Sequence, residues 1–284
     1  MNFATRVGVL FFGAISVAGV AYAAPAGNTD VDKIELAPHR AVYDLRLDKS
    51  RNNRHTAGVT GRILYDFSGN SCDGYALQFR QVSELNSGEG KASLSDLRTI
   101  TWEDGTATSY RFQSENMLDQ KAVETVDGQA ERRADGVAVN LTKPGNKKFD
   151  AEAGLVFPTE HMRRIIAAAR AGKTILELPV YDGSENGEKI FNTLTVIGAP
   201  IAPDQRVPTD AAAGQKAFSG MKRWPVTISY FDKVSKGGEQ TPIYSVAFEL
   251  YDNGVSRALV LDYNDFVLRG DMSSLEIKDS KPCK

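Results

Sequence analysis

The sequence predicts a mainly β protein, built on a large curled antiparallel sheet of about a dozen strands with one amphipathic α-helix. Most of the chain alternates between apolar and polar residues with a period of two, as half-buried strands do. Turn-forming residues separate these runs, and a single segment changes to a helical period. Because 42% of the 284 residues are hydrophobic, the chain can bury a core large enough for such a sheet.

The first 23 residues have the pattern of a secretory signal peptide. Arg6 supplies a positive charge, residues 7–20 form an apolar core, and Ala21, Tyr22 and Ala23 form an A-x-A cleavage box. A transmembrane helix needs about twenty apolar residues, and this run is shorter. We therefore expect cleavage at Ala23, which leaves residues 24–284 as a single β-spiral domain in the periplasm that does not span the membrane.

The alternation is clearest in the first predicted strand, HRAVYDLRLD. Its apolar face holds Ala41, Tyr43, Leu45 and Leu47, and its polar face holds Arg40, Asp44, Arg46 and Asp48. Similar patterns predict eleven further strands, at residues 61–67, 74–82, 97–104, 108–115, 119–126, 136–142, 189–198, 225–233, 243–254, 256–265 and 266–278.

Glycine-containing pairs supply the turns between these strands. We assign turns to Asp104-Gly105, Asp127-Gly128, Asp135-Gly136 and Asn253-Gly254, because glycine accepts the positive φ angles that tight hairpins need. Short links make sequential strands antiparallel neighbours. A dozen strands in one flat sheet would expose long edges, so we expect the sheet to curl into a spiral or open barrel.

The segment FPTEHMRRIIAAARAGK is the predicted helix. Its apolar stripe comprises Met162, Ile165, Ile166 and Ala169, and Gly172 offers a C-terminal cap. Pro158 suits the first turn, and Thr159 or a neighbour suits the N-cap. Three arginines, Arg163, Arg164 and Arg170, are expected on its solvent face. Farther along, the proline-rich and alanine-rich residues 198–218 predict a long exposed loop.

The two cysteines, Cys72 and Cys283, stand far apart in the chain. Export to an oxidising compartment favours a disulfide, and Cys72 to Cys283 is then the only intramolecular bridge available. Two free structural cysteines or an intermolecular bridge are the alternatives. A bridge across so long a loop would stabilise the fold by roughly 5 kcal/mol in the chain-entropy treatment.

Composition and motifs favour a protein without enzymatic activity. The net charge of −2 argues against a nucleic-acid binder. His39, His55 and His161 lack the spacing of a zinc site, and surface or capping roles are expected for His39 and His161. Sequence signatures of hydrolases and nucleotide binders are absent, so we expect no cofactor.

Two pairs of acidic residues nevertheless deserve a test as general acid and base, Asp262 with Asp265 and Glu249 with Asp252. Each pair lies near the end of a predicted strand. We favour the interpretation that both pairs belong to the polar face and the turn of a hairpin. An envelope hydrolase that uses Asp262 and Asp265 is the corresponding alternative function.

Several stretches together resemble the EipB-type cell-envelope integrity proteins of Alphaproteobacteria, a family once described as a domain of unknown function. They are LAPHRAVYDLRL, GRILYDFSGNSCDGYALQFR, LVFPTEHMRRIIAAARAG and VLDYNDFVLRG, together with the signal peptide and the near-terminal Cys283. The resemblance implies a periplasmic spiral sheet closed by a Cys72–Cys283 disulfide, which supports envelope integrity without a known reaction. It also implies a functional link to a periplasmic tetratricopeptide-repeat protein.

These observations lead to two main hypotheses of function. The first is a non-enzymatic periplasmic protein that supports the envelope by binding a protein partner. The second is a carrier that holds a lipid or lipoprotein in the concave interior of the sheet, because a curled sheet of this size has a diameter that its own side chains need not fill. Similar spiral sheets occur in carriers of lipids and lipoproteins, although this is an analogy of fold alone.

Overall fold

A computed structural model describes residues 31–51, 57–87, 92–232, 241–280 and 283. Within them, one sheet contains fourteen strands in the order β8-β7-β6-β5-β4-β3-β2-β1-β14-β13-β12-β11-β10-β9. The first eight strands are β1 His39–Ser50, β2 Gly58–Asn70, β3 Gly74–Asn86, β4 Ala92–Glu103, β5 Ser109–Leu118, β6 Lys121–Arg132, β7 Gly136–Lys143 and β8 Lys147–Glu152. The others are β9 Ile175–Val180, β10 Phe191–Ile197, β11 Arg223–Asp232, β12 Tyr244–Tyr251, β13 Ser256–Asp262 and β14 Phe266–Ile277.

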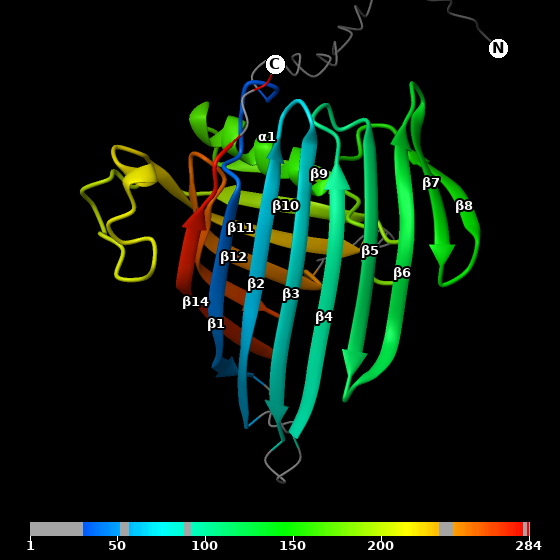
Figure 1. Cartoon of the computed structure of the whole chain (residues 1–284), viewed down its shortest axis with the longest axis horizontal. Coiled ribbons are helices and arrows are strands. Elements are labelled where there is room, and N and C mark those ends of the chain that lie inside the picture. Colours follow the sequence, from blue (N-terminus) through cyan, green and yellow to red (C-terminus); the bar gives the residue numbers. More distant parts are fainter. Residues whose placement is uncertain (1–30, 52–56, 88–91, 233–240, 281–282, 284) are drawn as a thin grey trace, which may run out of the picture.

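The topology explains how the sheet curls. The chain begins in the middle of the sheet at β1 and steps outward to β8 at one edge. Helix α1, Pro158–Arg170, then leads to β9 at the opposite edge, and the chain steps inward until β14 pairs with β1. Strands β10 to β12 cross behind β1 to β4 (Figure 1). The predicted fold class, a curled antiparallel sheet with one helix, is confirmed.

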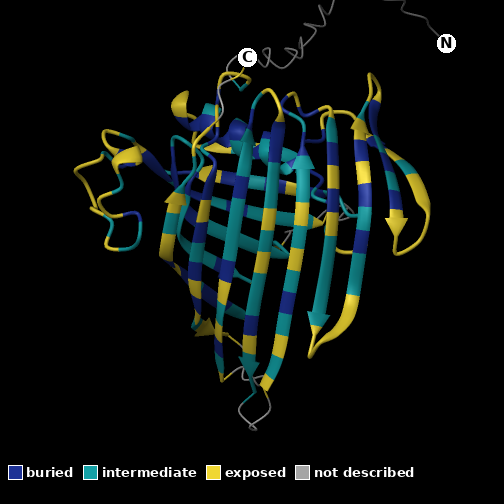
Figure 2. Cartoon of the chain, in the orientation of Figure 1, coloured by how far each residue is buried: buried dark blue, intermediate teal, exposed yellow. Residues whose placement is uncertain are grey.

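Burial along the strands follows the predicted alternation. In β1, Ala41, Tyr43 and Leu45 are buried while Arg40 and Asp44 are exposed. Figure 2 shows this alternation along the front strands of the sheet. The buried faces form three apolar clusters, and one of them joins Ile165 and Ile166 of α1 to the inner face of the sheet.

The two strands that the sequence analysis missed, β8 and β9, are the two edges of the sheet. Both are six residues long. Strand β8 begins with Lys147 and Lys148, and β9 contains Pro179. Short length, lysine and proline are devices that keep sheet edges from pairing with other chains, and they also remove the clean alternation that identifies a strand.

One predicted turn is wrong. Asp127 and Gly128 lie inside β6, at a register shift in its pairing with β7. A glycine in a strand often marks such a bulge, because the bulged residue needs conformational freedom. The turn at Asn253-Gly254 is present between β12 and β13, and Gly254 has a φ of 89°.

Helix α1 has the predicted position but a different N-terminus. The N-cap is Phe157, and it makes no side-chain capping bond. The carboxylate of Glu103, at the end of β4, instead accepts the backbone N–H groups of Thr159 and Glu160 at 2.7 Å each. The acidic cap therefore comes from a distant strand, which local sequence cannot reveal.

The long loop at residues 198–218 extends from one side of the sheet (Figure 1). Most of it is exposed, as predicted, but Ile201, Ala212 and Phe218 are buried. Phe218 lies in a short 3-10 helix, Lys216–Phe218, and stacks on Tyr251 with ring centroids 4.1 Å apart. Ile201 forms an isolated antiparallel bridge with Arg223 of β11, so the loop is attached to the sheet at both ends.

Candidate functional site

The concave face of the sheet encloses an apolar cavity of about 520 Å³. Its walls come from both halves of the sheet and from helix α1. They comprise His39, Tyr43, Ile63, Tyr65, Phe79, Gln81, Leu97, Met162, Asp182, Tyr230, Tyr244, Ser245, Val246, Phe248, Gly254, Ser256, Leu259, Leu261 and Tyr263. A cavity of this size with few polar groups has the character of a small-molecule site.

A second cavity, of about 230 Å³, lies beneath the first turns of α1. Pro158, Thr159 and His161 of the helix line it. The two cavities adjoin, because six residues line both: His39, Tyr65, Met162, Asp182, Tyr230 and Gly254. We call the two cavities together the chamber and these six residues its junction.

Tyrosines supply much of the polarity of the chamber. Burial raises the pKa of Tyr65 to about 12, and it also raises the pKa values of Tyr43, Tyr230 and Tyr244. These phenols are therefore uncharged at neutral pH. The Tyr43 hydroxyl donates to the carbonyl of Ser256 at 2.7 Å, and Tyr230 stacks on Tyr244 with centroids 4.3 Å apart.

Asp182 follows β9 and is the one residue with a carboxyl side chain among the described residues that line the chamber. One of its carboxylate oxygens accepts the backbone N–H of Ser184 at 2.9 Å. Burial raises the pKa of Asp182 despite this bond. Among the described lining residues there is no lysine or arginine to neutralise it. Asp182 is not among the site residues predicted from the sequence, because an Asp-Gly pair in a loop predicts only a turn.

Both described histidines line the chamber and are buried, so the prediction of surface or capping roles is wrong for each. His39 is 3% exposed, donates from Nδ1 to the carbonyl of Ala37 and stacks on Tyr65. His161 is 4% exposed, and its Nε2 atom has no hydrogen-bond partner among the described residues. Burial lowers the pKa of His161 to about 4 and also lowers that of His39. His55 lies outside the described residues.

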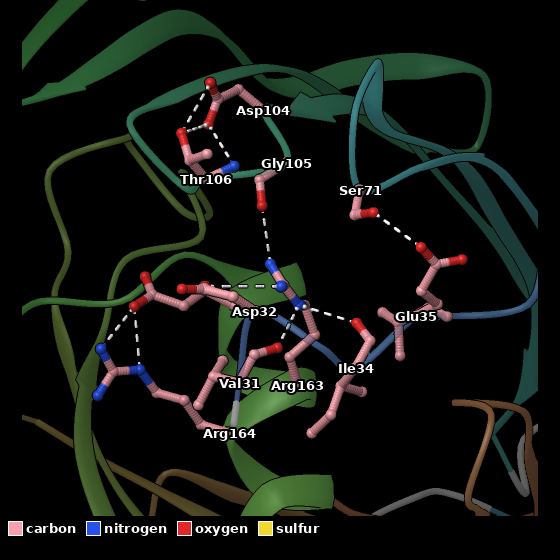
Figure 3. Close-up of polar contacts among 12 residues, drawn as sticks. Val31, Asp32, Ile34, Glu35, Ser71, Asp104, Gly105, Thr106, Arg163 and Arg164 are labelled. Atoms are coloured by element: carbon pink, nitrogen blue, oxygen red, sulfur yellow. Dashed lines mark hydrogen bonds and ion pairs between the residues drawn. The ribbon is translucent and has the colours of Figure 1, made fainter. Parts of the chain in front are cut away.

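Arg163 fixes the helix over the chamber, and its predicted place on the solvent face is wrong. The side chain is buried, donates from Nε to the carbonyls of Val31 and Ile34 at 3.1 Å, and donates from Nη1 to the carbonyl of Gly105 at 2.8 Å (Figure 3). Asp32 lies 3.7 Å from its Nη2. A buried guanidinium needs such partners, and here they join the helix to two other segments, residues 31–34 and the turn between β4 and β5.

A second buried group supports the start of the helix. Glu160 accepts hydrogen bonds from Arg132 at 2.7 Å and from Arg164, one turn later in the helix, at 2.7 Å. Arg132 belongs to β6 and also bonds to the carbonyl of Leu155. The first two turns of α1 are thus tied to β4 and β6 as well as to the N-terminal segment.

Cys72 and Cys283 are joined as a disulfide, with an S–S distance of 2.04 Å and a sequence separation of 211 residues. The bridge ties the C-terminal end to the turn between β2 and β3. The hydroxyl of the adjoining Ser71 donates to the carboxylate of Glu35 at 2.9 Å (Figure 3). Gly105 packs against the backbone carbonyl oxygen of Ser71. The disulfide therefore lies beside the segments that hold Arg163.

The acidic pairs have structural partners. Arg51 donates to both carboxylate oxygens of Asp262, and its guanidinium lowers the pKa of that group. Asp262 and Asp265 flank the turn between β13 and β14, as the hairpin interpretation predicts. Glu249 pairs with Arg223 and Arg257.

Asp252, the proposed partner of Glu249, instead pairs with Arg170 at 2.7 Å. The two acids are therefore held by different arginines. Across the described ranges, no group of three or more His, Cys, Asp or Glu residues is placed to hold a metal ion.

The predicted signal peptide and its cleavage site at Ala23 lie outside the described residues. In the part of the chain that the structure describes, no helix has the length and apolarity to span a membrane.

Residues 31–279 match the family described as EipB-like. The chain belongs to this family. It is 37% identical over 264 residues to the cell envelope integrity protein EipB of Brucella abortus (strain 2308), an alignment that covers 93% of this chain and 90% of that relative. These matches confirm the resemblance stated from the sequence.

The fold of this EipB-like chain also matches a solved structure. The crystal structure of a β-barrel-like protein of the domain of unknown function DUF1849, from Brucella abortus, aligns with a TM-score of 0.79 and 34% identity. The alignment covers 87% of this chain and all of that one. The curled sheet is thus shared with an experimentally determined member of the same fold.

Proposed function

We propose that this EipB-like chain is an exported, non-enzymatic protein that supports the integrity of the cell envelope. The observation that carries the proposal is the 37% identity to a protein named for envelope integrity, over 93% of the chain. The predicted signal peptide supports a periplasmic location for one domain at residues 24–284. The absence of catalytic motifs from the sequence, together with the arginine pairing of Asp262 and Glu249, supports a non-enzymatic role.

Deletion and complementation test this proposal. A strain that lacks the gene should become more sensitive to detergents and to antibiotics that act on the cell wall, and the full gene should restore resistance. A gene without codons 2–23 should not restore resistance, because its product stays in the cytoplasm. Unchanged resistance in the deletion strain would contradict an envelope role, and rescue by the leaderless gene would contradict periplasmic action.

A protein partner is part of the proposal, with a tetratricopeptide-repeat protein as the first candidate. Crosslinking in the intact periplasm, followed by purification of the tagged chain, should recover the same partner in repeated experiments. A tagged periplasmic protein of unrelated fold is the control. Recovery of the same proteins with both baits would contradict a specific partner.

The chamber favours a second function, that of a carrier for a lipid or the acyl chain of a lipoprotein. It is concave and apolar, and its walls come from both halves of the sheet and the helix. Native mass spectrometry of protein purified from the periplasm should show added mass that organic extraction removes. A homogeneous chain without added mass, from both detergent-free and lipid-supplemented preparations, would contradict this function.

A further inference from the structure

The polar groups at the chamber junction have a common character that limits what the chamber can bind. The lining contains the carboxyl of Asp182, two imidazoles and several phenols, and no lysine or arginine among the described lining residues. An anionic headgroup brought inside would lose its hydration without meeting a positively charged lining residue. The charges of Lys278 and Arg164, which lower the pKa values of His39 and His161, belong to residues outside the lining. The chamber is therefore unsuited to a buried carboxylate or phosphate.

His39 adds a hydrogen-bond acceptor at the junction. Its Nδ1 atom lies 2.8 Å from the carbonyl oxygen of Ala37, and because a carbonyl only accepts, Nδ1 carries the proton. Burial lowers the pKa of His39, so the ring is neutral and its Nε2 atom is an acceptor. Asp182 is an acceptor as well when it is ionised. A ligand that reaches the junction therefore meets two acceptors that require a donor, His39 Nε2 and the Asp182 carboxylate, beside the neutral phenols of Tyr65 and Tyr230, which can either donate or accept.

His161 is an independent sign that a polar ligand group belongs here. It is 96% buried, lines the second cavity, and its Nε2 atom has no partner among the described residues. Buried polar atoms almost always have a hydrogen-bond partner, so an unpaired atom on a residue that lines a cavity calls for one. The imidazole is uncharged at neutral pH, and it can donate to or accept from the same ligand.

We propose that the chamber binds an aliphatic chain that ends in a hydrogen-bond donor, such as a hydroxyl or ammonium group, with the donor at the junction between Asp182 and His39. Aliphatic carboxylates and phosphates of the same length are excluded from this position. The inference rests on the proposed carrier function and specifies its ligand class.

Competition binding tests this specificity with the mature full-length protein and its disulfide intact. The fluorescent probe 1-N-phenylnaphthylamine reports occupation of the apolar chamber, and decanol, decylamine and decanoate compete for it below their micelle concentrations. We expect decanol and decylamine to displace half of the probe at concentrations at least tenfold lower than decanoate requires. Equal or tighter binding of decanoate would overturn the inference but leave the carrier function standing. Failure of every ligand and of the probe to bind would overturn both.

Variants test whether Asp182 is responsible for the ligand preference. Asp182→Asn replaces an acceptor by a group that also donates, so the preference for decylamine over decanoate should fall at least tenfold. The matched control is Asp204→Asn, an exposed acid outside the chamber, which should keep the preference of the natural chain. An unchanged preference in a folded Asp182→Asn variant would overturn the assignment of Asp182. If that variant does not fold, the ranking of the three ligands on the natural chain still decides the proposal.

Discussion

The carboxylate of Glu103 at the end of β4 caps helix α1 at Thr159, with a distance of 2.7 Å between its oxygen and the backbone nitrogen. The two residues are 56 positions apart. Burial raises the pKa of Glu103 to about 7 even though two backbone N–H groups favour its charged form. The helix that covers the chamber thus begins on a titratable group, and a buried histidine, His161, lies one residue after the second of these N–H donors.

Glu103 and His161 should make opposite contributions to the pH dependence of stability. The folded-state pKa of Glu103, about 7, lies above its ordinary value of 4.5, so its contribution is present below pH 4.5 and is lost as the pH rises through 7. The folded-state pKa of His161, about 4, lies below its ordinary value of 6.5. Its contribution is therefore present above pH 6.5 and is lost as the pH falls through 4.

Denaturant unfolding of Glu103→Gln and His161→Gln between pH 4 and 7 separates these effects. The free energy of unfolding of Glu103→Gln minus that of the natural chain should rise with pH, while the same difference for His161→Gln should fall. Each change is on the order of 2 kcal/mol. If the difference in free energy of unfolding does not change between pH 4 and 7 for either variant, the shifted pKa values of Glu103 and His161 are contradicted.

Arg163→Met should strongly destabilise the protein. The substitution removes the donors to the carbonyls of Val31, Ile34 and Gly105, and unsatisfied buried acceptors together cost about 3 kcal/mol. Arg46→Met is the control, because Arg46 makes an exposed ion pair with Asp271 and such pairs contribute at most about 1 kcal/mol. Equal losses from the two substitutions, measured by urea unfolding, would refute the anchoring role of Arg163.

Loss of the disulfide should lower stability without changing the fold. Cys72→Ser, Cys283→Ser and the double variant should each lose about 2–5 kcal/mol, because each removes the same link across 211 residues. Thermal unfolding with and without reductant measures the effect. Reductant should lower the melting temperature of the natural chain only, and an unchanged melting temperature would show that the link does not stabilise the fold.

Gly105→Ala tests the close approach between two turns beside the disulfide. A Cβ atom at position 105 would lie 1.7 Å from the carbonyl oxygen of Ser71, so the backbone of one turn would have to move. Overpacking of this kind costs about 1–3 kcal/mol. Gly145→Ala is the control, because a Cβ there meets nothing within 4 Å. Thermal unfolding that does not distinguish the two variants would contradict the tight contact.

The sequence predicted the sheet well where strands have one buried and one exposed face. Alternation identified β1 and its neighbours, because a side-chain period of two is a local property. It missed β8 and β9, whose lysines and proline protect the edges of the sheet. The edge positions depend on pairing between distant segments, which local alternation does not record.

The chamber was less accessible to sequence analysis. Asp182, His39 and His161 come from a loop, a strand and a helix, and only the curl of the sheet brings them together. Arg163 fits a polar helix face by its residue type, yet carbonyls of remote segments surround it. The concave interior followed from strand number and curl, whereas its polar groups and their burial depend on tertiary contacts.

The proposed carrier function requires that the chamber serve the envelope role, and filling the chamber tests this claim most directly. Leu259→Trp places a large side chain into the chamber, and Val196→Trp places the same side chain on an exposed part of β10. Both variants are expressed in the deletion strain, at levels matched by immunoblot, and detergent resistance is measured. We predict that Val196→Trp restores resistance and that Leu259→Trp, folded and exported, does not. Full resistance with a folded Leu259→Trp variant that no longer binds 1-N-phenylnaphthylamine would contradict the claim.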